Sequence, residues 1–309
     1  MAVLFLCDIE DAETWIERFR AALPEEEIRV FPEVGDRAAI DIALVAKPPA
    51  GELAKLPGLK LICSLWAGVD GLLRDPTFPR QVTLARLVDP YMTQAMSESA
   101  LAHVMAAHRQ LHTYRAQQAA GEWRMLQQPR SHDRRVGMLG LGALGTDAAL
   151  KLKALGFDVA GWSRQPKSVP GIESFAGLDK LEAFLARTEI LVCLIPLTVE
   201  TRGLMNAKAF AALPRDAFVI NLARGPLIVD HDLLAALDSG HLSGAVLDVF
   251  HAEPLPADHP YWRHPKVQIT PHIAAISDVR SVVDVIADNI RGFRAGQPVR
   301  SRVDLTAGY

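Results

Sequence analysis

The stretch VGMLGLGALG, residues 136–145, follows a short apolar run and opens a segment whose apolar residues recur at helical spacing. Within it, Gly140, Gly142 and Gly145 form the pattern G-x-G-x-x-G. At a strand–helix junction such glycines allow a tight turn, let the backbone approach a pyrophosphate and permit close packing of helix on strand. The first helical turn also presents free N–H groups to phosphates. The motif predicts a Rossmann-type dinucleotide site formed by Gly140, Leu141, Gly142, Ala143, Leu144 and Gly145. An ordinary glycine-rich turn is the alternative.

Strand-like apolar runs alternate with helical patterns on both sides of this motif. These runs lie at residues 3–6, 42–46, 59–64, 136–139, 158–161, 190–194, 218–221, 245–249 and 267–270. Continuous apolar strands separated by helices are typical of parallel sheets that helices cover on both faces. We therefore predict an α/β protein built from Rossmann-like, doubly wound parallel sheets.

Two long helical patterns, at residues 93–120 and 278–295, interrupt this alternation, and Gly296 is a plausible stop for the second. A chain of 309 residues is long enough for about two domains, and the first helix is long enough to pass between them. Because the glycine motif follows the first long helix, we predict that a dinucleotide-binding domain, 98–285, is inserted into a substrate domain, 1–97 plus 286–309.

Charge and hydropathy exclude several partners. The formal net charge is −3, without the Lys/Arg surplus that nucleic-acid binding requires. The longest apolar run, residues 190–197, is well short of the roughly 20 residues of a membrane span. The first residues lack a basic region, and Asp8 ends their apolar stretch too early for a signal peptide. We expect a cytoplasmic protein with no nucleic-acid or membrane partner.

No metal site is predicted. Cys7, Cys63 and Cys193 stand in apolar runs without metal-ligand spacing, as buried thiols of a reducing compartment do. His108 and His112 have i, i+4 spacing but lack the following Glu and a third ligand, so we expect a structural role for them.

The second strand of the motif unit ends without the carboxylate that binds the ribose 2′-hydroxyl in NAD enzymes. Ser163, Arg164 and Lys167 follow it instead. Two cations and a hydroxyl suit a 2′-phosphate, which an Asp would repel. We predict NADP(H) as cofactor, with NAD weaker; a solvated basic loop is the alternative.

Polar residues follow three further strands: Arg224 the first, Asp248 and Glu253 the second, His272 the third. Ligands bind at the carboxyl edge of an open parallel sheet, so these side chains can converge. Arg224 can bind a carboxylate with two N–H groups, and His272 can exchange a proton near neutral pH. Glu253 would hold the imidazole ring and favour its charged form. Taken singly, each residue has a simpler explanation: a surface ion pair, a solvated acid, a strand-end histidine.

Several motifs in this order resemble the D-isomer-specific 2-hydroxyacid dehydrogenase family over nearly the whole chain. Besides the glycine motif they are NLARG (221–225), LDVF (247–250), EPLP (253–256) and TPH (270–272). Longer stretches are most similar to the glyoxylate/hydroxypyruvate reductase A branch of that family. These are WSR (162–164) with KS (167–168), PGIESFAG (170–177), LLAALDSG (233–240) and AGY (307–309).

The resemblance implies NADPH-dependent reduction of small 2-oxo acids, glyoxylate to glycolate and hydroxypyruvate to glycerate. It implies that Arg224 binds the substrate carboxylate and carbonyl, that His272 is the acid/base and that Glu253 is its partner. Asp248 would orient the nicotinamide carboxamide. The residues implied to flank the cofactor are Pro196, Leu197, Thr198, Leu222 and Ala223.

The substrate-anchoring loop of the family corresponds to Trp66, Ala67, Gly68 and Val69, whose successive amides could cradle a carboxylate. A simple turn into a helix is the alternative. One departure lies nearby: the chain has AKPP at residues 46–49, where the resembled reductases have Trp-His before two prolines. Trp66 stands where they carry a small residue.

Two other functions remain open at this point. One is a different D-2-hydroxyacid dehydrogenase, of the phosphoglycerate or D-lactate type; the other is a non-catalytic dinucleotide-sensing corepressor or scaffold. The first long helix and the loop after it carry apolar surface, and by family likeness we expect a homodimer through His103, Tyr114, Trp123 and Met125.

Overall fold

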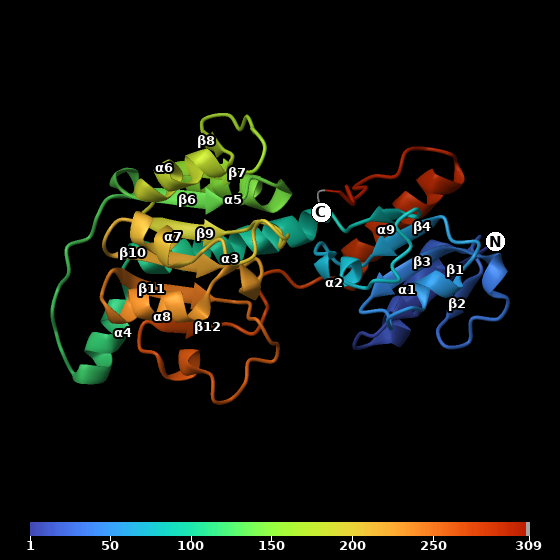
Figure 1. Cartoon of the computed structure of the whole chain (residues 1–309), viewed down its shortest axis with the longest axis horizontal. Coiled ribbons are helices and arrows are strands. Elements are labelled where there is room, and N and C mark those ends of the chain that lie inside the picture. Colours follow the sequence, from blue (N-terminus) through green and yellow to red (C-terminus); the bar gives the residue numbers. More distant parts are fainter. Residues whose placement is uncertain (307–309) are drawn as a thin grey trace. The chain divides into compact units, whose positions relative to one another are not determined.

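The computed structural model describes residues 1–306 and divides into two compact units, each with one sheet (Figure 1). One unit is Met1–Met92 together with the chain from Ser277 onward, and the other is Thr93–Ile276. The two divisions fall five and nine residues before the expected boundaries at 97/98 and 285/286, respectively. The AGY stretch at 307–309 lies outside the described residues.

The first unit has a five-stranded parallel sheet in the order β2-β1-β3-β4-β5. Its strands are β1 (Ala2–Cys7), β2 (Ile28–Val30), β3 (Ile40–Ala46), β4 (Leu61–Ser64) and β5 (Thr83–Ala85). Its helices are α1 (Ala12–Ala22), α2 (Asp70–Leu73) and α9 (Val279–Arg294). α1 packs against α9, and Arg294 at the end of α9 binds Glu26 and the buried Asp41. These contacts join the end of the chain to its beginning.

The second unit has a seven-stranded parallel sheet in the order β12-β11-β10-β9-β6-β7-β8. Its strands are β6 (Arg135–Leu139), β7 (Asp158–Ser163), β8 (Glu173–Ala176), β9 (Ile190–Cys193), β10 (Ala217–Asn221), β11 (Leu242–Leu247) and β12 (Val267–Ile269). Its helices are α3 (Pro90–His108), whose first residues precede the division, α4 (Leu111–Ala120), α5 (Ala143–Ala154), α6 (Leu181–Ala186), α7 (Ala207–Ala212) and α8 (Asp230–Asp238).

Helices cover both faces of this larger sheet. Residues of α6, α7 and α8 belong to one buried cluster, and residues of α3 and α5 belong to another. In β9, Leu191 and Cys193 face the first cluster, whereas Ile190 and Val192 face the second. A strand that is apolar on both faces reads as a continuous apolar run, so the predicted doubly wound α/β class is confirmed. The strand order reverses between β6 and β9, where ligands bind in such sheets.

The single long helix expected at 93–120 is wrong: the chain forms α3 and α4 with a break at Arg109 and Gln110. Gln110 has a left-handed φ of 56°, and its side-chain amide donates to the carbonyl of Gln127. The break separates two ring contacts, His108 edge-on to Phe157 and His112 beside Phe218, each with centroids 5.0 Å apart. No Gly or Pro marks this break in the sequence, so tertiary packing decides it.

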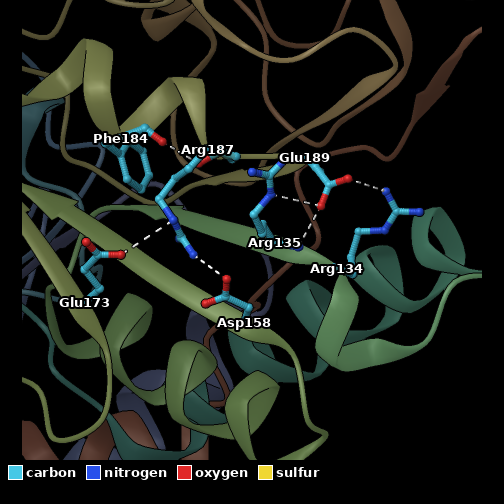
Figure 2. Close-up of polar contacts among 8 residues, drawn as sticks. Arg134, Arg135, Asp158, Glu173, Phe184, Arg187 and Glu189 are labelled. Carbon is cyan, nitrogen blue, oxygen red and sulfur yellow. Dashed lines mark hydrogen bonds and ion pairs between the residues drawn. The ribbon is translucent and has the colours of Figure 1, made fainter.

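Two groups of ion pairs lie at the beginnings of four strands of the larger sheet (Figure 2). Glu189 accepts from Arg134 and Arg135 at 3.3 and 3.4 Å. Arg187 binds Asp158 at 2.7 Å and the first residue of β8 at 3.6 Å. These pairs lie at the amino edge of the sheet. The candidate site lies at the opposite, carboxyl edge.

Candidate active site

The glycine loop between β6 and α5 leaves room only where a ligand would need it. Gly140 has φ +123°, and a Cβ there would lie 2.7 Å from the carbonyl carbon of Leu194. A Cβ at Gly145 would lie 1.8 Å from the oxygen of Gly140, whereas one at Gly142 would meet nothing within 4 Å. Two glycines therefore serve the packing and the third faces open space at the start of α5. This cradle fits a dinucleotide pyrophosphate.

The loop after β7 carries the predicted phosphate ligands. The Ser163 hydroxyl donates to the backbone oxygen of Gln165 at 2.7 Å, which tightens the turn. Arg164 forms an ion pair of 2.9 Å with Glu200, and Lys167 is exposed. The loop therefore presents two basic side chains, one of which, Arg164, is paired with the carboxylate of Glu200.

The loop after β9 is fastened by its own hydroxyls. The Thr201 hydroxyl donates to the carbonyl of Pro196 at 2.7 Å and accepts from the N–H of Thr198 at 2.8 Å. Leu197, Leu222 and Ala223 are buried beside the neighbouring strand ends. The predicted cofactor-flanking residues therefore lie at the carboxyl edge of the sheet, where hydrogen bonds and burial hold them in place.

Glu253 and His272, which lie on loops after adjacent strands, form a hydrogen-bonded pair. Nδ1 of His272 is 2.7 Å from one Glu253 oxygen, and the other oxygen accepts from the N–H of Phe250 at 2.9 Å. Both carboxylate oxygens are engaged, so the imidazole is held in one orientation. Because Nδ1 faces the carboxylate, Nε2 is the nitrogen that can exchange a proton with a ligand.

Asp248 fixes the backbone that carries His272. Its side chain, 1% exposed, accepts from the Thr270 hydroxyl at 2.6 Å and from the N–H groups of Ile273 and Ala274 at 2.9 and 3.0 Å. Its backbone oxygen accepts from the N–H of His272, whose φ is 54°. The sequence predicts that Asp248 orients the nicotinamide; it does not predict that Asp248 holds the turn that carries His272.

The loop that carries Arg224 is shaped by a residue absent from the predicted site, Asn221. This fully buried side chain donates to the carbonyl of Arg224 at 3.0 Å and accepts from the N–H of Ala223 at 3.2 Å. A Cβ at Gly225 would lie 2.0 Å from the carbonyl carbon of Phe250, so only glycine fits there. The Arg224 loop is therefore packed against the residue whose N–H binds Glu253.

Burial shifts the pKa of two thiols and of three histidines on α3 and α4. Burial raises the pKa of Cys63 and of Cys193 to about 12, and it lowers the pKa of His103, His108 and His112. Among residues 1–306, no three His, Cys, Asp or Glu side chains are grouped to bind a metal. Within the same range no helix is long and apolar enough to cross a membrane.

Comparison with known proteins identifies the family. Residues 101–274 match the model of the NAD-binding domain of D-isomer specific 2-hydroxyacid dehydrogenases. The chain belongs to the D-isomer-specific 2-hydroxyacid dehydrogenase family. This confirms the family predicted from the ordered motifs, and it makes the protein an oxidoreductase.

Relatives of this dehydrogenase match over its full length. Glyoxylate/hydroxypyruvate reductase A of Serratia proteamaculans is 43% identical over 100% of both chains. A family member from Xanthobacter autotrophicus, solved with NADPH and MES, is 43% identical with a TM-score of 0.95 over 100% of this chain and 99% of its own. An NADPH-dependent glyoxylate/hydroxypyruvate reductase from Sinorhizobium meliloti, solved with NADP and sulfate, is 40% identical with a TM-score of 0.92 over 100% of both.

The first unit of the dehydrogenase contains the predicted substrate loop, which follows β4. The Ser64 hydroxyl donates to the carbonyl of Trp66 at 2.9 Å and accepts from its N–H at 3.1 Å. None of the described residues accepts a hydrogen bond from the N–H groups of Ala67, Gly68 and Val69. Three successive amides at one strand end are thus available to an anion.

Proposed function

We propose that this dehydrogenase uses NADPH to reduce small 2-oxo acids, with glyoxylate and hydroxypyruvate as substrates. The observation that carries the proposal is the 2.7 Å hydrogen bond between Glu253 and His272, on loops next to that of Arg224. The reductase names of the full-length relatives support the substrate class. The NADPH and NADP bound by relatives agree with the cofactor predicted from the loop after β7.

The residues fit the cofactor at two places, and the family resemblance assigns it a third residue, Asp248. The open space at Gly142 admits the pyrophosphate at the start of α5. Ser163, Arg164 and Lys167 would bind the 2′-phosphate, and Asp248 would orient the carboxamide. When bound, NADPH supplies the hydride for the carbonyl carbon.

The protein's own residues bind the acid and supply the proton. In the second unit, the guanidinium of Arg224 would bind the carboxylate of the acid. In the first unit, the successive amides of residues 67–69, next to Trp66, offer a carboxylate-binding group of their own. His272 then gives the proton on Nε2 to the carbonyl oxygen, while Arg224 stabilises the negative charge that develops there. Glu253 holds the ring throughout this transfer.

Initial rates with NADPH and NADH against glyoxylate, hydroxypyruvate, pyruvate and phenylpyruvate test this proposal. We expect the highest kcat/KM for the first two acids, and NADPH well ahead of NADH. Equal or greater efficiency with NADH would refute the cofactor assignment. Tight NADPH binding without turnover of any 2-oxo acid would favour a dinucleotide-sensing scaffold instead.

We also propose that the dehydrogenase is a homodimer through α4 and the extended segment after it, which runs outside the sheet towards β6 (Figure 1). Trp123 and Met125 on this segment are 99% and 90% exposed. Exposed aromatic surface of this kind is typical of subunit interfaces. Sedimentation should give twice the chain mass, and Trp123→Ser with Met125→Ser should shift it towards the monomer. A monomeric parent protein would contradict the proposal.

We propose a cytoplasmic location, as expected from the cysteines. Cys7, Cys63 and Cys193 are free thiols, which a reducing compartment maintains. Recovery of the activity in the soluble cytoplasmic fraction would test this, and recovery with secreted proteins would contradict it.

A further inference from the structure

The carboxyl edge of the smaller sheet carries two cations, Lys47 and Arg86, in addition to the amides that could bind a substrate carboxylate. β3, β4 and β5 are adjacent and parallel, with Val45 paired to Ser64 and Cys63 paired to Ala85. Lys47 follows β3 two residues after Val45, and Arg86 follows β5 directly. Both cations therefore leave the sheet at the edge where β4 delivers Trp66 and the free amides of residues 67–69.

Lys47 is held over the substrate loop. Its backbone is left-handed, with φ 47°, which is uncommon for a residue with a side chain. Its ammonium lies 5.7 Å from the centroid of the Trp66 ring, within range of a cation–π contact. The Trp66 backbone is itself fixed by the Ser64 hydroxyl on both sides. Lys47 is exposed, and no carboxylate of the described residues pairs with it, so its N–H groups remain available to a ligand.

Arg86 is a partly buried cation on the other side of the loop. Desolvation lowers the pKa of its guanidinium, which nevertheless stays charged. Within residues 1–306 no carboxylate forms an ion pair with it. A partly desolvated charge without a counter-ion is unfavourable, and an anionic ligand would relieve this.

We propose that, among 2-oxo acids longer than glyoxylate, this edge favours those with a second anionic group, a carboxylate or a phosphate, on the carbon beyond the carbonyl. The free amides bind the first carboxylate, and Lys47 and Arg86 bind the second group from either side of Trp66. The chemistry is unchanged: the carbonyl carbon gains a hydride and its oxygen a proton. This inference rests on the proposed function and names Lys47 as a specificity-determining residue.

Matched substrate pairs isolate the second charge. Oxaloacetate and 2-oxobutanoate have the same carbon chain length but differ in the second carboxylate; 3-phosphohydroxypyruvate and hydroxypyruvate differ in the phosphate. We expect the parent protein to prefer the dianion in at least one pair. Lys47→Ala should reduce that preference, as a ratio of kcat/KM values, about three- to tenfold. The pair that responds identifies whether carboxylate or phosphate is bound.

Two further variants control this experiment. Lys47→Arg keeps the charge and the ring contact and should retain most of the preference. Lys60→Ala removes an exposed lysine just before β4, at the amino edge of the same sheet, and should leave both ratios unchanged. A preference for the monoanion in both pairs, or ratios that Lys47→Ala does not change, would overturn the inference.

Binding separates this inference from the proposed function. Calorimetry with malonate and propionate, in the presence of NADPH, measures the second charge without turnover. If no 2-oxo acid is reduced but Lys47→Ala weakens malonate binding alone, the proposed function fails and the anion site stands. If glyoxylate is reduced but neither malonate binding nor the substrate ratios depend on Lys47, the function stands and the inference fails.

Discussion

His272 illustrates how individual side chains define this site. Glu253 orients its ring, whereas Asp248 fixes the turn that carries its backbone in a left-handed conformation. The sequence predicted that Glu253 holds the ring of His272, but it gave no sign that Asp248 fixes the turn. Asn221 likewise stands in a recognised motif, yet its hydrogen bonds to the Arg224 loop become visible only in three dimensions.

Arg164 gives a residue-level test of cofactor choice. Arg164→Ala should raise the KM for NADPH about tenfold or more, since a charge-assisted contact to phosphate is lost. The KM for NADH should barely change. Initial rates at varied cofactor concentration measure both values.

Glu200, which pairs with Arg164, supplies the matched control. Glu200→Gln removes the carboxylate that competes with a phosphate, so it should leave the KM for NADPH equal or lower. A parallel rise for both cofactors in Arg164→Ala would mean that the residue supports the fold of the loop instead.

At the scale of the element, the junction of β6 and α5 separates packing from ligand binding. Gly145→Ala places a Cβ against the Gly140 oxygen, so it should lower the melting temperature or prevent folding. Gly142→Ala meets open space at an ordinary φ of −75°, so the melting temperature should stay near that of the parent protein. Its KM for NADPH should nevertheless rise about tenfold, because the methyl group occupies the pyrophosphate's place. Thermal melts and kinetics together check this, and an unchanged KM would contradict the cradle.

The start of α9 gives an element-level prediction of pH dependence. Asp278 accepts from the side chain and the N–H of Arg280, which lowers its pKa from 3.8 to about 2. A lowered carboxyl pKa contributes stability that is present above pH 3.8 and lost as pH falls towards 2. Asp278→Ala should therefore reduce the free energy of unfolding by about 1 kcal/mol at neutral pH.

Denaturant titrations at several pH values measure this difference, which should shrink on acidification below pH 4. Asp278→Asn, which keeps the capping oxygen, should lose less at neutral pH. A difference between the parent protein and Asp278→Ala that is the same at every pH would contradict the assigned cause.

Short marginal strands explain which elements the sequence did not predict. β2 and β5 have three residues and β8 has four, and each of them is an edge strand of its sheet. β8, Glu173–Ala176, is mostly exposed, so it carries no continuous apolar run. The central strands, buried on both faces, were all predicted to within a few residues, because the apolar signal is produced by that burial.

At the scale of the whole molecule, contacts between residues far apart in sequence were the hardest to predict. The sequence predicted that the last helix returns to the first unit, because of its length and its place in the chain. It did not predict the ion pair of Arg294 with Glu26. The contact between Lys47 and the ring of Trp66 was not predicted either. These two residues depart from the family pattern, and it is the register of β3 and β4 that brings them together. Family motifs thus predicted the residues of the candidate site, whereas the contacts between distant residues are seen only in the folded chain.

The most direct test of the account is the single-turnover rate of glyoxylate reduction by enzyme already loaded with NADPH, compared between the parent protein and His272→Ala. Loss of a positioned general acid should slow this step by about two to four decades, with NADPH affinity retained. Glu253→Gln should slow it less, since the ring remains but its orientation is weakened. A His272→Ala rate within about threefold of the parent rate would contradict the central assignment, since general acid catalysis is worth far more than that.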